Sequence, residues 1–123
     1  ETILLVDDEK MIIDVGKQMM EKLGYRLLVA STGNEAISLY EKNMGKIDLV
    51  ILDMIMPGDN GAEAYQKLKK INSGIKVLVS SGFWCDAQVK KILNDKQNSF
   101  IQKPFKYEEL NEKVDSILSK YKK

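Results

Sequence analysis

The sequence contains no histidine and only one cysteine, Cys85. These absences exclude Ser-His-Asp and Cys-His catalysis, His-ligated metal sites, an intrachain disulfide and a Cys-based zinc site. Lys and Arg number 19 against 18 Asp and Glu, so the net charge of +1 lacks the basic excess of a dedicated nucleic-acid binder. No apolar run approaches the ~18 residues of a membrane span, and no signal peptide is recognisable. We therefore expect a cytoplasmic domain that contacts neither nucleic acid nor membrane.

The chain has 123 residues, which predicts one domain, residues 1–123, given a usual size of roughly 150 residues. Five short apolar runs alternate with longer amphipathic segments. The runs are nearly continuous and rich in β-branched residues, as in strands buried on both faces of a parallel sheet. They cover residues 3–6, 27–30, 49–52, 77–79 and 100–101.

Apolar residues recur with helical spacing between these runs. The first helix is predicted to bury Ile12, Val15, Met19 and Leu23 and to end at Gly24. The later helices are predicted from a Thr-Gly-Asn-Glu capping box at residues 32–35, after Gly61, from about residue 86 to 94, and over residues 110–121. The order (βα)5 predicts a doubly wound α/β fold with a five-stranded parallel sheet and right-handed crossovers.

Polar residues end four of the five predicted strands. Ligands of such sheets bind beyond the carboxyl ends of the strands, where the sequence places Asp7, Asp8, Asp53, Ser81 and Lys103. Two carboxylates ~4 Å apart repel by on the order of 4 kcal/mol at an effective dielectric of about 20, so either a divalent cation or a raised pKa must relieve them. Oxygen ligands without His or Cys suit Mg²⁺, or Mn²⁺, rather than zinc.

These strand ends carry a family resemblance over nearly the whole chain. The sequence resembles the receiver domains of two-component response regulators in four motifs, in order and at the expected spacing: Leu-Val-Asp-Asp-Glu at 5–9, Asp-Met-Ile-Met-Pro at 53–57 with a glycine at 61, Ser-Gly at 81–82, and Lys-Pro-Phe at 103–105. The resemblance implies a flavodoxin-like sheet of order 2-1-3-4-5. It also implies a phosphoprotein in a phosphorelay, which catalyses its own phosphorylation and dephosphorylation.

The resemblance further implies the phosphoacceptor and the metal ligands. Asp53 would accept a phosphoryl group from a histidine kinase or a histidine phosphotransfer domain. Asp8, Asp53 and the backbone carbonyl of Ile55 would bind Mg²⁺, and Asp7 would act through a water molecule. Because the chain has no histidine, it cannot carry a phosphohistidine itself, so the donor is another domain or a small acyl phosphate.

Other residues are implied to transmit or time the signal. Ser81 and Lys103 would contact the phosphoryl oxygens, while Ser81 and Phe100 would form a switch that acts on the face made by helix 4, strand 5 and helix 5. An output or partner domain would read that face. Ile55 and Phe83 border the approach of the hydrolytic water, and neither side chain can orient that water, so we expect slow self-dephosphorylation.

Three loops add weaker predictions. Residues 58–61, Gly-Asp-Asn-Gly, predict a turn, and residues 83–85, Phe-Trp-Cys, either cap the core or face a partner. Residues 94–99 read Asn-Asp-Lys-Gln-Asn-Ser, where the family often has Gly-Ala, so this loop is expected to differ in shape. Residues 80–83 and 100–105 resemble receivers of hybrid sensor kinases, which favours a domain of a larger signalling protein over a stand-alone regulator.

Three other functions stay open at this point. An aspartyl-nucleophile, Mg²⁺-dependent phosphatase or phosphotransferase usually has Asp-x-Asp at its first strand, whereas this chain has adjacent Asp7 and Asp8. A flavodoxin-like nucleotide module would need a Gly-rich or hydroxyl-rich loop after the first strand. A degenerate receiver used as a scaffold would not need competent residues at all five site positions.

Overall fold

A computed structural model describes residues 2–56, 59–81, 87–95, 97–102 and 105–119. Five parallel strands form one sheet in the order β2-β1-β3-β6-β7. These strands are β1 (Thr2–Val6), β2 (Arg26–Ala30), β3 (Leu49–Asp53), β6 (Val77–Ser81) and β7 (Ser99–Gln102). The predicted flavodoxin-like order 2-1-3-4-5 is therefore confirmed.

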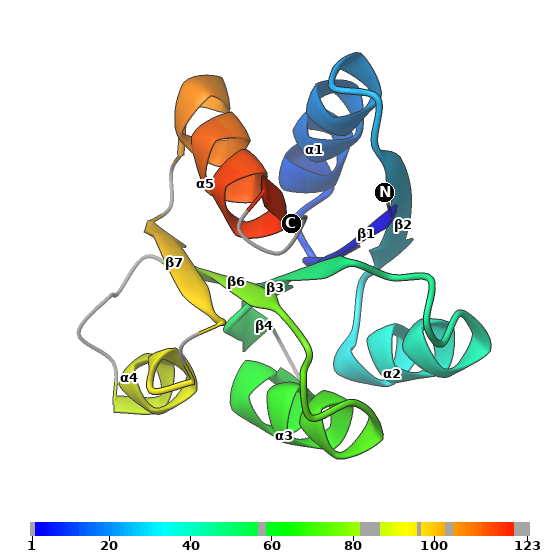
Figure 1. Ribbon diagram of the computed structural model, residues 1–123, viewed down its shortest axis with the longest axis vertical. Helices are drawn as coiled ribbons and strands as arrows, with labels where there is room; N and C mark the ends of the chain where they lie inside the picture. Colours follow the sequence, from blue (N-terminus) through cyan, green and yellow to red (C-terminus); the bar gives the residue numbers. More distant parts are fainter. Residues whose placement is uncertain (1, 57–58, 82–86, 96, 103–104, 120–123) are drawn as a thin grey trace.

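Five helices cover the two faces of the sheet. They are α1 (Lys10–Lys22), α2 (Gly33–Lys42), α3 (Gly61–Ile71), α4 (Ala87–Leu93) and α5 (Tyr107–Ser119). Helices α1 and α5 lie on one face, here called the α1/α5 face, and helices α2, α3 and α4 lie on the other, the α2–α4 face (Figure 1). No helix in the described part of the chain is long and apolar enough to cross a membrane.

Alternate residues of each strand contribute to two separate hydrophobic cores. Leu4 and Val6 of β1 belong to the core beneath α2, α3 and α4, whereas Ile3 and Leu5 belong to the core beneath α1 and α5. The same alternation runs through β3, β6 and β7, because successive side chains of a strand point to opposite faces. Burial on both faces explains why the strand sequences are apolar without interruption.

The predicted buried face of α1 is wrong at one position. Val15 is 41% exposed, and its neighbour Gly16 is buried instead. A Cβ atom at Gly16 would lie 2.7 Å from Cδ2 of Leu5, so glycine lets the helix approach β1 closely. Because glycine carries no hydrophobic side chain, the apolar spacing of the sequence pointed to Val15.

The predicted helix ends are largely confirmed. Gly24 follows α1 with a φ of 83°, a left-handed conformation that glycine adopts easily. At the start of α2, the Thr32 hydroxyl accepts a hydrogen bond from the backbone N–H of Glu35 at 3.1 Å. The Glu35 carboxylate accepts from the N–H of Ser31 at 3.3 Å, one residue earlier than a capping box requires.

A short hairpin interrupts the connection from β3 to α3. Strands β4 (Ile55–Met56) and β5 (Asp59–Asn60) pair antiparallel, with Ile55 opposite Asn60. The sequence predicted only a turn over residues 58–61, but residues 59–60 form a strand and Gly61 begins α3. This hairpin directly follows the carboxyl end of β3.

Candidate acidic site at the carboxyl end of the sheet

Asp7 and Asp8 leave the sheet at the end of β1. The backbone N–H of Asp7 donates to the carbonyl of Ala30 at 3.0 Å, which continues the pairing of β1 with β2. The Asp7 carboxylate accepts from the N–H of Glu9 at 2.9 Å, so it also shapes the turn into α1. Asp7 is 1% exposed, whereas Asp8 is exposed to solvent.

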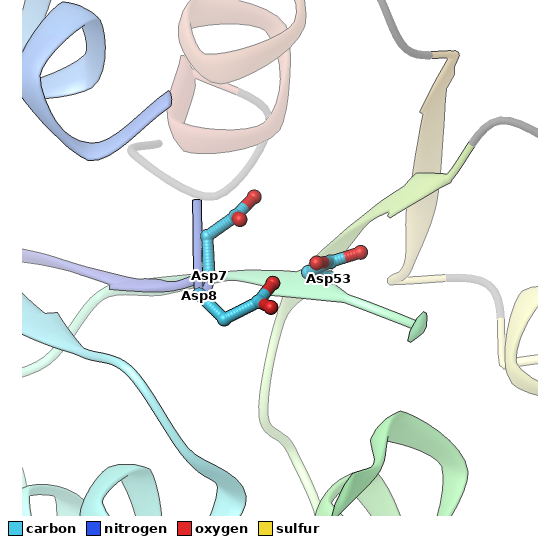
Figure 2. A group of neighbouring side chains, drawn as sticks. All are labelled: Asp7, Asp8 and Asp53. Atoms are coloured by element: carbon cyan, nitrogen blue, oxygen red, sulfur yellow. The ribbon is translucent and has the colours of Figure 1, made fainter. Parts of the chain in front are cut away.

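Asp53 is the last residue of β3, which lies between β1 and β6 in the centre of the sheet. All five residues of β3 are buried, and Asp53 is 3% exposed. Figure 2 shows Asp7 and Asp8, which follow β1, lying beside Asp53 at the end of β3. One carboxylate oxygen from each of Asp7, Asp8 and Asp53 lies within 4.8 Å of the others.

This arrangement fits a hard divalent cation. Carboxylate oxygens are the ligands that Mg²⁺ prefers, and the described part of the chain offers no softer donor at this site. Three carboxylates this close repel one another, and a divalent cation between them would add attractions that outweigh this repulsion. The predicted convergence of Asp7, Asp8 and Asp53 is therefore confirmed.

Two serines end β6 beside this cluster. Ser80 is the register partner of Asp53, and Ser81 follows it; they are 2% and 3% exposed. Leu78 belongs to the core of the α1/α5 face and Val79 to the other core. By the alternation of a strand, Ser80 therefore faces the α1/α5 side and Ser81 the α2–α4 side.

Phe100 lies on the strand next to these serines. It pairs with Val79 across β6 and β7, so it is on the same face of the sheet as Ser81. Its side chain is half-buried and packs against the core beneath α2, α3 and α4. The structure thus brings the two predicted switch residues onto one face of adjacent strands.

Other predicted site residues are described in part or not at all. Phe83 and Lys103 lie outside the described residues, as do Trp84 and Cys85. Ile55 is described as part of β4, but its side chain is not. Sequence reasoning gave Ser80 no role in the site, although a polar residue in an otherwise apolar buried strand was a visible signal.

Comparisons with known proteins agree on one family. The sequence model of the response regulator receiver domain matches residues 3–115. The sensor kinase CckA of Brucella abortus (strain 2308) is 32% identical over 119 residues, which is 97% of this chain and 13% of that protein. This chain therefore corresponds to a small part of that kinase.

Comparison with solved structures indicates the same family. The crystal structure of the receiver domain from the hybrid histidine kinase CckA superposes with a TM-score of 0.81 at 31% identity, covering 96% of this chain and 99% of that one. The CheX-CheY-BeF₃-Mg²⁺ complex from Borrelia burgdorferi gives a TM-score of 0.86 at 26% identity, covering 94% of this chain and 87% of the matched one.

Proposed function

The chain belongs to the response regulator receiver domains of two-component systems, and we propose that it accepts a phosphoryl group on Asp53 in a Mg²⁺-dependent phosphorelay. One observation carries the proposal: the buried carboxylate that ends the central strand shares a 4.8 Å cluster with two further carboxylates. A structural relative solved in complex with BeF₃ and Mg²⁺ supports it.

The metal would be held by the acidic cluster. We assign Asp8, Asp53 and the backbone carbonyl of Ile55 as ligands of Mg²⁺, with Asp7 acting through a water molecule; Mn²⁺ would serve as well. When bound, the cation neutralises the negative charge that builds up during phosphoryl transfer. The hydrogen bond from the Glu9 N–H to Asp7 helps to hold that carboxylate in place.

The reaction is a displacement at phosphorus. A carboxylate oxygen of Asp53 forms a bond to phosphorus while the phosphorus–nitrogen bond of a phosphohistidine breaks, and the imidazole of the partner leaves. Ser81 and Lys103 contact the phosphoryl oxygens. The donor is a histidine kinase or a histidine phosphotransfer domain, because this chain has no histidine.

The phosphoryl group adds negative charge at a strand end, and the chain must convert that charge into movement. We propose that Ser81 moves toward it and that Phe100 follows, because both lie on the same face of β6 and β7. The output or partner domain then reads the surface formed by α4, β7 and α5. Trp84 is the only tryptophan and offers a fluorescence reporter of this change.

The lifetime of the signal is also part of the proposal. Ile55 and Phe83 border the path of the hydrolytic water and cannot hydrogen-bond it, so phosphorylated Asp53 should decay slowly. A long-lived phosphoryl group suits reverse transfer to a histidine, as in a receiver attached to a hybrid kinase. We propose that the domain is part of such a larger cytoplasmic signalling protein.

Intact mass tests the phosphoacceptor. Incubation with acetyl phosphate and Mg²⁺ should add one phosphoryl group, and EDTA should prevent the addition. Asp53→Asn should abolish it, whereas Asp14→Asn, an exposed acid on α1, should leave it unchanged. A mass shift that persists in Asp53→Asn would overturn the assignment, and steady turnover of a phosphomonoester would favour a phosphatase instead.

A further inference from the structure

Ser80 has no role in the phosphoryl transfer proposed above. It is the direct partner of Asp53 in the register of β3 and β6. The residues two before them, Leu78 and Ile51, both belong to the core of the α1/α5 face. Because strand side chains alternate, Ser80 and Asp53 project from the same face on neighbouring strands.

The Ser80 hydroxyl is a buried polar group between one polar and one apolar neighbour on the adjacent strands. The side chain is 2% exposed, and its Oγ has no hydrogen-bond partner among the described residues. Its other register partner, on β7, is the buried Ile101. An unsatisfied buried hydroxyl destabilises a fold, whereas alanine would pack there without that penalty.

We propose that Ser80 is a positioning residue, whose hydroxyl donates a hydrogen bond to the Asp53 side chain when the phosphoryl site is engaged. The bond orients the carboxylate that attacks phosphorus and satisfies a donor that is otherwise buried without a partner. This inference rests on the proposed function, because it concerns the reactivity of Asp53. Ser80 would then orient Asp53, and Ser81 would contact the phosphoryl group, since the two serines face opposite sides of the sheet.

The inference predicts a difference between two isosteric variants. Ser80→Thr and Ser80→Val add the same volume to the strand, and both are β-branched residues that strands accept. Only Thr retains the hydroxyl. With acetyl phosphate and Mg²⁺, we expect the phosphorylation rate of Ser80→Thr to stay within about twofold of wild type and that of Ser80→Val to fall at least fivefold.

Thermal unfolding of the metal-free variants separates positioning from packing. Ser80→Val should be at least as stable as Ser80→Thr, because it lacks a buried hydroxyl. A slow rate in a variant of full stability is not a folding defect. If both variants keep wild-type rates, or both lose the same activity at full thermal stability, the hydroxyl has no positioning role and the inference is wrong.

Ser80→Ala is a third variant, for the case in which neither Thr nor Val fits at this position. It adds no volume, and we expect it to slow phosphorylation at least fivefold while it keeps or raises thermal stability. An unchanged rate in Ser80→Ala would refute the inference on its own. Asp53→Asn in parallel keeps the two hypotheses apart: if the wild-type protein is not modified at Asp53, the proposed function fails, whereas equal rates for the Ser80 variants overturn only the role of Ser80.

Discussion

The two ends of the parallel sheet treat acidic side chains in opposite ways. At the carboxyl end, Asp7, Asp8 and Asp53 gather with their oxygens within 4.8 Å. At the amino end, near the start of β6 and β7, Asp95 accepts hydrogen bonds from the Tyr65 hydroxyl and from the Lys69 ammonium, the latter at 2.5 Å. Like charges gather at one end, whereas at the other end an acidic side chain is paired with a lysine.

Asn98 is the centre of the amino-end network. Its Nδ2 donates to the hydroxyl of Tyr65 at 2.7 Å and to the carbonyl of Ile92 at 2.9 Å. Its Oδ1 accepts from the backbone N–H of Val77 at 2.9 Å. The amide thereby joins α3, the last turn of α4 and the first residue of β6, directly before β7 begins. Asp95 and Asn98 both belong to the loop of residues 94–99, so this loop contributes a polar anchor between the sheet and the helices.

The comparison indicates that the groups that stabilise the fold and the candidate functional residues lie at opposite ends of the strands. The amino-end network is centred on the buried side chains of Tyr65 and Asn98, and its polar groups are hydrogen-bonded, which stabilises a fold and fixes one geometry. The carboxyl end holds three carboxylates close together, and their mutual repulsion costs stability. Perturbing the two ends should therefore change the free energy of unfolding with opposite signs.

The largest effect should come from Asn98→Ala. The substitution leaves the buried backbone N–H of Val77 without its acceptor and removes one donor each from the Tyr65 hydroxyl and the Ile92 carbonyl, so we expect the free energy of unfolding to fall by about 2–4 kcal/mol. Urea unfolding measures it. Asn34→Ala, at an exposed position of α2, is the matched control and should change stability by less than about 0.5 kcal/mol. A loss below about 1 kcal/mol for Asn98→Ala would show that the network adds little.

A smaller effect should appear at alkaline pH. Burial, with the hydrogen bond to Asp95, raises the pKa of Tyr65 from 10.0 to about 12. A pKa raised on folding contributes stability that is complete below pH 10 and disappears as the pH rises from 10 to 12. The wild type should thus exceed Tyr65→Phe in stability at pH values well below 10, by on the order of 1–2 kcal/mol after partial solvent screening.

Urea unfolding at several pH values follows this difference. The gap between the wild type and Tyr65→Phe should narrow above pH 10 and close near 12. Absorbance titration gives a second readout, because the late ionisation of Tyr65 in the wild type should be missing from Tyr65→Phe. A constant gap over this pH range would contradict the raised pKa of Tyr65.

The smallest effect, and of opposite sign, is expected at the acidic end. Without metal, Asp53→Ala should be more stable than the wild type, because it removes one of three repelling carboxylates. A ligand that binds only the native state at roughly tenfold excess over its Kd stabilises by about 1.4 kcal/mol, so Mg²⁺ should stabilise the wild type by that amount. The same addition should have little effect on Asp53→Ala.

Thermal unfolding in EDTA and in about 10 mM Mg²⁺ tests this, for a Kd of about 1 mM. Asp14→Ala, an exposed acid on α1, should retain the full Mg²⁺ effect. An unchanged melting temperature of the wild type would remove the basis for the metal site, and a wild type more stable than Asp53→Ala in EDTA would contradict the repulsion.

The sequence by itself determined the alternation of the five sheet strands with five helices along the chain, because buried parallel strands and amphipathic helices leave local patterns that need no knowledge of distant residues. It also determined that Asp7, Asp8 and Asp53 meet, since the carboxyl ends of parallel strands share one edge of the sheet. These conclusions depend on spacing along the chain and on general rules of the fold.

Only the tertiary structure decided which polar residues face one another. The positions of Ser80 and Ser81 relative to Asp53 depend on strand register and on which helices cover each face. The choice of Gly16 over Val15 for the close approach of α1 depends on the distance between helix and sheet. The bond between Tyr65 and Asn98 joins residues 33 positions apart. Hydrophobic periodicity is a local signal, whereas a hydrogen bond between distant residues exists only after the chain has packed and excluded water.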